Sequence, residues 1–260
     1  MSVARARARA RWLAVLERAG TRAFPIGEYV GQESFVTARE ALALARAAGA
    51  RPGASVLDLC CGAGGLDLLV AVRTGCQTTG VDLDTDALRI ARAGATRSGL
   101  QDQTRYVRAD AARLPFARAF DAVLLYETLL AFPDPRPLLS EVARVVRPGG
   151  RLALTLEAGD PLTPEERALL PNGGTAHLLP EAAFRRALAA CGFRVLSLAD
   201  HTAGHAGIAA RLADAFALDR AAITAAVGER AYDDAVTSHR RWAAWLDSGR
   251  VRKLAIVAAR

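Results

Sequence analysis

The chain has 260 residues, of which 52% are hydrophobic and 23% are charged, and its formal net charge is +7. This length and composition fit one large α/β domain, and no apolar run reaches the roughly 18 residues that a membrane span requires. Residues 1–22 hold six arginines and one glutamate, a net charge of +5, which leaves +2 for the remainder. A nucleic-acid enzyme usually spreads its basic surface over the folded body, so we expect no nucleic-acid partner. Because no apolar run could span a membrane, we also expect a cytoplasmic protein without a membrane partner.

The chain begins with the arginine-rich segment of residues 1–22. Residues 12–24 have the pattern of a helix, which the Phe-Pro-Ile-Gly sequence at residues 24–27 ends. We interpret the segment as a solvated helix and expect activity without residues 1–11; an electrostatic tether to an acidic partner is the alternative. Residues 23–260 are expected to form a single domain.

A glycine-rich turn follows the first expected strand. The strand carries Asp58 and leads into Gly62, Ala63 and Gly64, and a second strand ends at Asp82. Glycines in such a turn let a ligand approach the backbone, where a side chain would clash. The acid at the end of the second strand can accept hydrogen bonds from two ribose hydroxyls. These residues together predict a nucleoside-containing cofactor at the carboxyl ends of parallel strands.

The spacing of the turn argues against a dinucleotide. The dinucleotide fingerprint requires a third glycine at position 67, where this chain has Asp67. Asp58 also lies beside the turn, and a carboxylate there favours a cationic amino group over a pyrophosphate. The turn resembles motif I of the class I S-adenosylmethionine-dependent methyltransferases, and Asp82 matches the acid that binds ribose in that family.

Further motifs of the family follow in the expected order. Residues 106–111 resemble its third strand, and residues 120–126 resemble its fourth. The Arg-Pro-Gly-Gly turn at residues 147–150 precedes an apolar strand, which is typical of this family. The resemblance covers roughly residues 29–200. It implies an α/β, Rossmann-like, doubly wound sheet of seven mostly parallel strands with an antiparallel last strand.

The second half of the chain contains an unusually long connection. Helices are expected at residues 138–146 and 184–191, strand six at residues 193–198 and a closing strand at residues 251–258. The intervening segment 199–250 has helical periodicity, whereas the family often joins these two strands by a short connection. Strand six should end at the cofactor edge of the sheet, so we expect a helical lid over the acceptor pocket. A purely structural helical pair is the alternative.

The resemblance implies S-adenosylmethionine as the cofactor and S-adenosylhomocysteine as the product. Tyr29 and Gln32 would donate hydrogen bonds to the cofactor carboxylate, with an ordinary loop as the alternative. Asp110 and Ala111 form the step that meets adenine in the family. The expected cofactor residues are Tyr29, Gln32, Asp58, Gly62, Ala63, Gly64, Asp82, Leu83, Asp110, Ala111 and Tyr126.

Four residues are candidates for contact with the acceptor. Glu127 follows strand four and would bind a cationic amine or take a proton; alternatively, it holds a loop or the cofactor ammonium. His201 and His205 begin the expected lid, and histidine exchanges protons near neutral pH. Capping and loop hydrogen bonds are their alternative role. Trp242 lies on an aromatic stripe that is either core or, if it faces the pocket, a cation–π surface. We assign catalysis to Glu127 and His201 and substrate contact to all four.

No metal site is expected. The four cysteines have no C-x-x-C spacing, and the four histidines have no H-E-x-x-H spacing. Some quinone-precursor methyltransferases carry E-x-x-E-H after strand four, but this chain continues from Glu127 without the later acid and histidine.

These features predict methyl transfer to a nitrogen, oxygen or carbon atom of a small molecule, by a monomer or homodimer. Abundant arginine and alanine indicate a GC-rich bacterial genome. Together with the expected lid, this composition favours tailoring in secondary metabolism, including antibiotic biosynthesis. Cyclisation or another non-methylating reaction on the same fold is the alternative. A nucleic-acid methyltransferase is less favoured, because no N-P-P-Y-type motif follows strand four.

Overall fold

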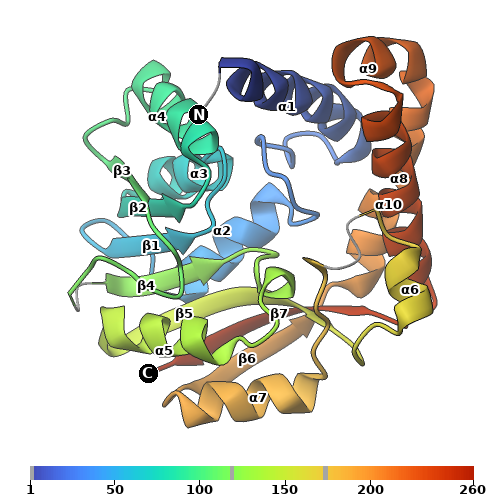
Figure 1. The fold of residues 1–260 in the computed structure, drawn as a ribbon. Coiled ribbons are helices and arrows are strands. Elements are labelled where there is room, and N and C mark those ends of the chain that lie inside the picture. Colours follow the sequence, from blue (N-terminus) through green and yellow to red (C-terminus); the bar gives the residue numbers. More distant parts are fainter. Residues whose placement is uncertain (1–2, 118–119, 172–174) are drawn as a thin grey trace.

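A seven-stranded mixed β-sheet lies at the centre of the molecule (Figure 1). The computed structural model describes residues 3–117, 120–171 and 175–260. The strand order is β3-β2-β1-β4-β5-β7-β6, and β7 runs antiparallel to both of its neighbours. The strands are β1 (Ser55–Leu59), β2 (Gln77–Asp82), β3 (Thr104–Arg108), β4 (Phe120–Leu125), β5 (Val146–Ala158), β6 (Arg194–Asp200) and β7 (Arg252–Ala259). The predicted sheet with its antiparallel last strand is confirmed.

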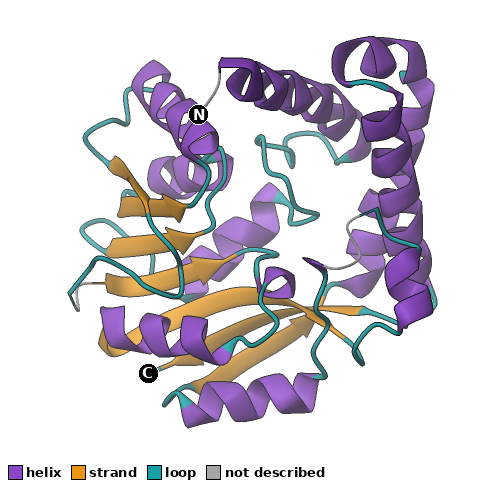
Figure 2. Cartoon of the chain, viewed as in Figure 1, coloured by secondary structure: helices purple, strands orange, loops and turns teal. Residues whose placement is uncertain are grey.

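Helices cover both faces of the sheet (Figure 2). Successive side chains of a strand point to opposite faces. Leu57 and Leu59 of β1 therefore pack in one core with α5 and α7, whereas Val56 packs in another core with α2 and α3. The helices of these layers are α2 (Ala38–Ala47), α3 (Gly65–Thr74), α4 (Thr85–Arg97), α5 (Arg136–Val145) and α7 (Glu181–Ala190). Two short helices, η1 (Leu129–Ala131) and α6 (Pro164–Ala168), follow β4 and β5.

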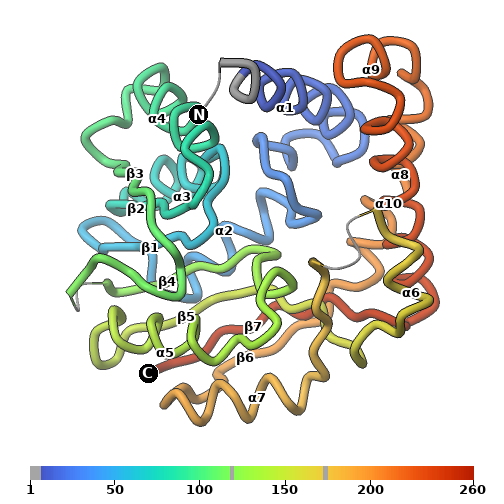
Figure 3. The backbone as a smooth tube through the Cα atoms, viewed as in Figure 1, coloured from blue at the N-terminus to red at the C-terminus, as the bar shows by residue number. Residues whose placement is uncertain are grey.

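The segment between β6 and β7 folds as three helices that form a separate core with α1. These helices are α1 (Val3–Ala23), α8 (Thr202–Leu218), α9 (Arg220–Val227) and α10 (Glu229–Asp247). Figure 3 shows α1 beside α8 and α9, although they lie at opposite ends of the sequence. Trp12, Val15, Leu16 and Ala19 recur at helical spacing and pack in this core with Phe216 of α8. The structure thus differs from the expected solvated segment, because α1 begins at Val3 and buries an apolar stripe.

Both ends of this helical insertion lie at the same edge of the sheet. β6 is antiparallel to β7, β7 is antiparallel to β5, and β5 runs parallel to β4 and hence to β1. The carboxyl end of β6 therefore lies at the same edge as that of β1, as predicted. In the described part of the chain, no helix is long and apolar enough to cross a membrane.

Candidate active site

A cavity of about 280 Å³ lies at the carboxyl ends of β1 and β4. The strand order reverses between these two strands, and open α/β sheets bind ligands in the crevice at such a reversal. The structure therefore brings much of the predicted cofactor site together. The predicted residues that line the cavity are Gln32, Asp58, Gly62, Ala63, Asp82, Tyr126 and Glu127.

The glycine turn after β1 presents its backbone to this cavity. Cys60, Gly62 and Gly64 have φ angles of 60°, 55° and 78°, a region that glycine adopts without strain. A non-glycine residue there, such as Cys60, costs free energy and is most common at ligand sites. Asp82 Oδ2 accepts a hydrogen bond from the Gly62 N–H at 2.9 Å, and its Oδ1 accepts one from the Asp84 N–H at 2.8 Å. The end of β2 therefore holds the turn in position.

Two buried carboxyl groups lie beside the turn. Asp58 lines the cavity and is 4% exposed, and Asp67 of α3 is 2% exposed. Burial, and then the neighbouring Asp67 carboxylate, raises the pKa of Asp58 well above its ordinary range. Burial also raises the pKa of Asp67 to about 7. A ligand ammonium at Asp58 would offset the cost of an ionised carboxylate there, whereas a pyrophosphate would be repelled.

The predicted donors to the cofactor carboxylate do not fit that role. Gln32 Nε2 donates to the Glu28 and Val36 carbonyls at 3.0 and 2.8 Å, so its amide hydrogens hold its own loop. The Tyr29 ring lies outside the cavity and packs on Phe24, with ring centroids 5.4 Å apart. Both Gln32 amide hydrogens are thus engaged within its own loop, and Tyr29 does not line the cavity. The sequence pattern did not reveal this packing.

Other predicted cofactor residues lie just beyond the cavity. They are Gly64, Leu83, Asp110 and Ala111. Leu83 is 60% exposed directly after Asp82, and Asp110 accepts a hydrogen bond from the Ala112 N–H at 2.9 Å. Leu83 and Asp110 follow the ends of β2 and β3, at the same edge of the sheet as the cavity. Their contact with adenine remains a prediction.

Arg9, which the sequence analysis did not assign, lines the cavity from α1. Its Nη1 donates to Glu33 Oε2 at 2.8 Å, and its Nε lies 3.4 Å from Asp84 Oδ2. Burial alone would lower the pKa of Arg9, but the Glu33 and Asp84 carboxylates raise it above its ordinary value. The arginine thus joins the loop before α2 to the loop after β2. The sequence shows only an arginine-rich helix, and the way in which α1 docks decides that Arg9 is the arginine that lines the cavity.

Glu127 is held as an ionised anchor rather than as a proton acceptor. The Glu127 backbone has a φ of 51°. Glu127 Oε1 accepts a hydrogen bond from the Phe35 N–H at 3.0 Å and lies 2.6 Å from Lys253 Nζ. Burial alone would raise the pKa of Glu127, but Lys253 and His205 hold it at about 2. Lys253 also pairs with Glu157, its neighbour across β5 and β7. Lys253 is the single lysine of the chain, and this was the available signal for a buried cation.

His201 and His205 line neither this cavity nor the one described next. His205 is 2% exposed, and its Nε2 lies 2.7 Å from Glu40 Oε2. His201 Nδ1 lies 3.4 Å from Glu40 Oε1. The predicted catalytic role of His201 and the predicted substrate contacts of both histidines do not fit this geometry. The first turn of α8 directs them toward α2, which the sequence of the insertion alone does not reveal.

A second cavity of about 380 Å³ lies between α1, η1 and α10. Trp12 and Trp242 supply aromatic walls, and Leu130 lines both cavities. Trp242 lines this cavity, and its contact with a substrate remains a prediction. In the described part of the chain, no arginine or lysine lines this cavity, whereas Asp234 does.

His239 is the titratable ring in the second cavity. Its Nδ1 lies 2.7 Å from the Ala235 carbonyl oxygen, so the neutral ring donates from Nδ1 and keeps a lone pair on Nε2. Burial lowers the pKa of His239, which favours this neutral form. The ring packs between Phe35 and Phe216 at centroid distances of 5.8 and 5.0 Å. The sequence does not distinguish this histidine, because its helical stripe is equally consistent with core packing.

The region that builds the first cavity has recognisable relatives. Residues 57–154, from β1 into β5, match a family of methyltransferase domains. Over this region the chain is similar to class I S-adenosylmethionine-dependent methyltransferases. The cofactor of these methyltransferases is S-adenosylmethionine, and S-adenosylhomocysteine is its product.

Individual methyltransferases are similar in sequence to parts of this chain. Methyltransferase GfsG of Streptomyces halstedii is 38% identical over 103 residues, which are 39% of this chain and 37% of that protein. The ubiquinone biosynthesis O-methyltransferase of Xanthomonas axonopodis pv. citri (strain 306) is 37% identical over 132 residues, 50% of this chain and 53% of that protein. The chain spans about a third to a half of the length of the curated relatives that it matches first. The crystal structure of the cyclase SpnF has the same fold, with a TM-score of 0.77 at 23% identity over 95% of this chain and 92% of that one.

The first cavity fits the cofactor of these methyltransferases. Asp58 would offer a buried carboxylate to the ammonium of the methionine moiety, and Asp82 would offer acceptors to the ribose hydroxyls. Gly62 allows close approach of the ligand to the backbone of the turn. When bound, the cofactor supplies a methyl group activated by a sulfonium.

Proposed function

We propose that this methyltransferase transfers a methyl group to a small, largely apolar, ring-bearing acceptor bound in the second cavity. Trp12 and Trp242 offer flat surfaces on which rings stack or pack edge to face. Leu130 lines both cavities, so an acceptor in one lies next to a cofactor in the other. The single observation that supports the proposal most strongly is this shared wall.

The charges of the second cavity narrow the acceptor further. Asp234 is its only acidic lining residue among those described, and no arginine or lysine lines it. Phosphate and carboxylate groups would lack a cationic partner there. We therefore infer a neutral or cationic acceptor. A hydroxyl or an amine fits best, because His239 Nε2 can accept the proton that such a group loses on methylation.

In this proposal, some residues bind the cofactor and another accepts the proton. Asp58 and Asp82 hold the cofactor, and Glu127 holds the Phe35 backbone beside it. The acceptor lone pair forms a bond to the methyl carbon as the carbon–sulfur bond breaks, and that bonding pair stays on sulfur. The acceptor proton passes to His239 Nε2 and then to solvent. Most of the rate enhancement comes from alignment and exclusion of water, because the methyl is already activated.

We further propose a role in tailoring natural products of bacterial secondary metabolism. The arginine-rich composition and the aromatic acceptor cavity support this assignment. The cyclase SpnF has the same fold, and a fold does not determine a reaction. Methyl transfer must therefore be measured directly.

The test incubates the protein with methyl-labelled S-adenosylmethionine and a panel of hydroxylated or aminated aromatic and macrocyclic compounds. Phosphorylated analogues of the same compounds are the controls. We expect stoichiometric S-adenosylhomocysteine and labelled product with at least one neutral or cationic acceptor, and none with its phosphorylated analogue. Conversion of an acceptor into an isomer of equal mass, without release of S-adenosylhomocysteine, would contradict the proposal and show that the protein catalyses a cyclisation.

A further inference from the structure

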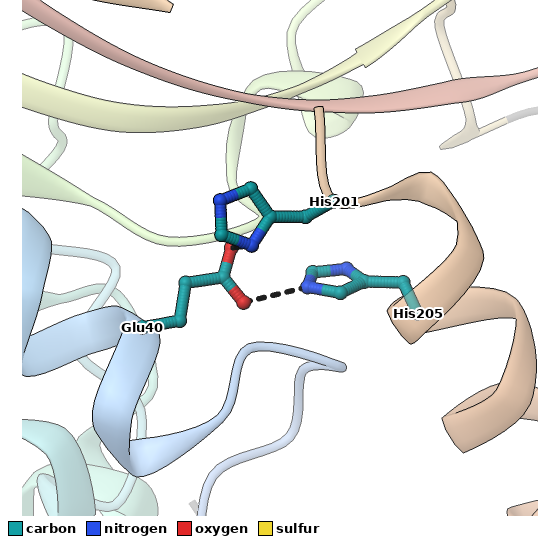
Figure 4. Close-up of side chains that lie close together, drawn as sticks. All are labelled: Glu40, His201 and His205. Carbon is teal, nitrogen blue, oxygen red and sulfur yellow. Dashed lines mark hydrogen bonds and ion pairs between the residues drawn. The ribbon is translucent and has the colours of Figure 1, made fainter. Parts of the chain in front are cut away.

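Three potential metal ligands converge outside both cavities. Glu40 comes from α2, His201 from the end of β6, and His205 from the first turn of α8 (Figure 4). One ligand atom from each side chain lies within 4.8 Å of the other two. Glu40 Oε2 lies 2.7 Å from His205 Nε2, and Glu40 Oε1 lies 3.4 Å from His201 Nδ1.

We propose that Glu40, His201 and His205 bind a divalent transition-metal ion, with Zn²⁺ as the ion of best-matched chemistry. Two imidazoles and one carboxylate form a ligand set that suits Zn²⁺. Tetrahedral Zn²⁺ with bonds of roughly 2.0–2.1 Å places its ligand atoms about 3.3 Å apart. Glu40 Oε1 already has this spacing from His201 Nδ1, and Glu40 Oε2 lies 2.7 Å from His205 Nε2. One ligand atom from each of the three side chains lies within 4.8 Å of the others, so small side-chain rotations would bring them around one ion.

The hydrogen bonding of the cluster is incomplete without a ligand. The Glu40 side chain is 5% exposed, and its Oε1 has no hydrogen-bond partner in the described part of the chain. His205 Nδ1 likewise makes no hydrogen bond there that meets the geometric criteria, although it lies 3.4 Å from Glu127 Oε1. A buried carboxylate oxygen without a donor costs free energy that a cation beside it would offset.

The surrounding charges also favour a cation. The Lys253 ammonium pairs with Glu127 and Glu157, and His205 lies between Glu127 and Glu40, so one ammonium serves a group of three largely buried carboxylates. A divalent ion held by neutral imidazoles would balance the three carboxylates together with Lys253. Buried charges are stable only when such neutralisation is available.

The position of the cluster indicates a structural ion. Glu40 belongs to a helix that packs on the sheet, whereas His201 and His205 stand where the chain enters the insertion α8–α10. A bound ion would therefore join the insertion to the sheet layer at its first turn. His201 is 36% exposed, which leaves a route for the ion and an open coordination position for water. This proposal does not depend on the acceptor or on methyl transfer.

The test measures metal binding to the full chain, purified without a polyhistidine tag and stripped with a chelator. Calorimetric titration with Zn²⁺ should show one site, and Co²⁺ should give the visible absorption of a tetrahedral complex. The His201→Ala variant should lose at least about tenfold in affinity, and His201 is exposed enough that its removal does not threaten folding. His177→Ala is the matched control, because His177 lies outside the cluster, and it should bind Zn²⁺ as the unaltered chain does.

Thermal unfolding gives an independent readout. Zn²⁺ should raise the Tm of the unaltered chain and of His177→Ala, and at the same Zn²⁺ concentration it should raise the Tm of His201→Ala by less. Glu40→Gln should weaken binding as well, because it removes the charge but keeps the shape. Equal Zn²⁺ affinity in the unaltered chain and in His201→Ala would overturn the proposal, as would the absence of a one-to-one complex in the stripped protein.

Discussion

Asp67 is a buried acid whose ionisation opposes folding. Its ordinary pKa is 3.8 and its pKa in the folded protein is about 7, so the folded state binds more protons between these values. The free energy of unfolding therefore falls as pH rises from about 4 to about 7, through this group. Asp67→Asn removes the effect and should stabilise the cofactor-free protein at pH 8 by roughly 1–4 kcal/mol more than at pH 4.

Urea unfolding at the two pH values measures this difference. Asp102→Asn, at an exposed acid in the loop before β3, is the control and should show no such dependence. An Asp67→Asn variant whose stability relative to the unaltered chain is the same at both pH values would contradict the assignment.

His239 is the residue whose replacement should affect turnover most directly. If its Nε2 accepts the proton of the acceptor, His239→Gln should lower kcat by ~10²–10⁴-fold while cofactor affinity stays near normal. Because burial lowers the pKa of His239, the rate of the unaltered enzyme should fall only below the ordinary histidine range. The Ala235 carbonyl and the Glu127 carboxylate act in the opposite direction on the pKa of His239, but burial outweighs them. Asp234 is the acidic residue that lines the same cavity.

The pH–rate profile separates proton transfer from packing. His239→Gln should remove the acidic limb of the profile, whereas a merely structural role would lower the rate and keep the limb. His177→Gln is the control. Unchanged kcat in His239→Gln would mean that the acceptor arrives already nucleophilic.

At the scale of elements, α1 lines the first cavity, where we expect the cofactor to bind. Arg9 pairs with Glu33 and Asp84 at the edge of the cavity. Arg9→Ala should therefore weaken binding of S-adenosylhomocysteine by about 0.5–2 kcal/mol, since two loops lose a common partner. Arg7→Ala, two residues earlier on an exposed position, is the matched control.

Calorimetry at low and high salt tests this role. The loss in Arg9→Ala should shrink as salt screens the partly exposed ion pairs. Equal affinity of Arg9→Ala and Arg7→Ala for S-adenosylhomocysteine would mean that α1 takes no part in cofactor binding, as the sequence predicted. Deletion of residues 1–11 should then also be harmless, whereas the structure leads us to expect weaker cofactor binding.

The elements of the fold could be predicted because their signals are local. Each of these signals depends only on residues that are adjacent in sequence. They are the apolar strand before Gly62, the acid at Asp82 and the turn at residues 147–150. The extra length of α1 and the partners of His205 depend on which helix docks on which, and no local pattern contains that information. Half of the site was therefore predictable, and the rest depended on the docking of α1 and α8.

At the scale of the whole molecule, one buried ion cluster joins its layers. Lys253 of β7 contacts Glu157 of β5 and Glu127 after β4, and Glu127 lies 3.4 Å from His205 of α8. Lys253→Met would leave two buried carboxylates without their cation. We expect a loss of roughly 3–5 kcal/mol of unfolding free energy, the scale for breaking a buried pair from one side.

Arg252→Met is the control for this prediction, because the neighbouring Arg252 is 46% exposed and pairs with Asp200 and Glu181 at the surface. Its loss should be about 0–1 kcal/mol in the same urea titration. Equal losses in the two variants would show that the buried cluster adds no stability beyond a surface pair.

The burial of Lys253 has a consequence for the chemical reactivity of the protein. It is the only lysine in the chain and is 2% exposed, so the folded molecule offers amine-directed acylating reagents no accessible lysine side chain. An acyl group can reach its nitrogen only when β7 separates from the helices above it. The rate of Lys253 acylation should therefore follow the rare opening of the sheet core. A single mass increment on one tryptic peptide would count those opening events under native conditions.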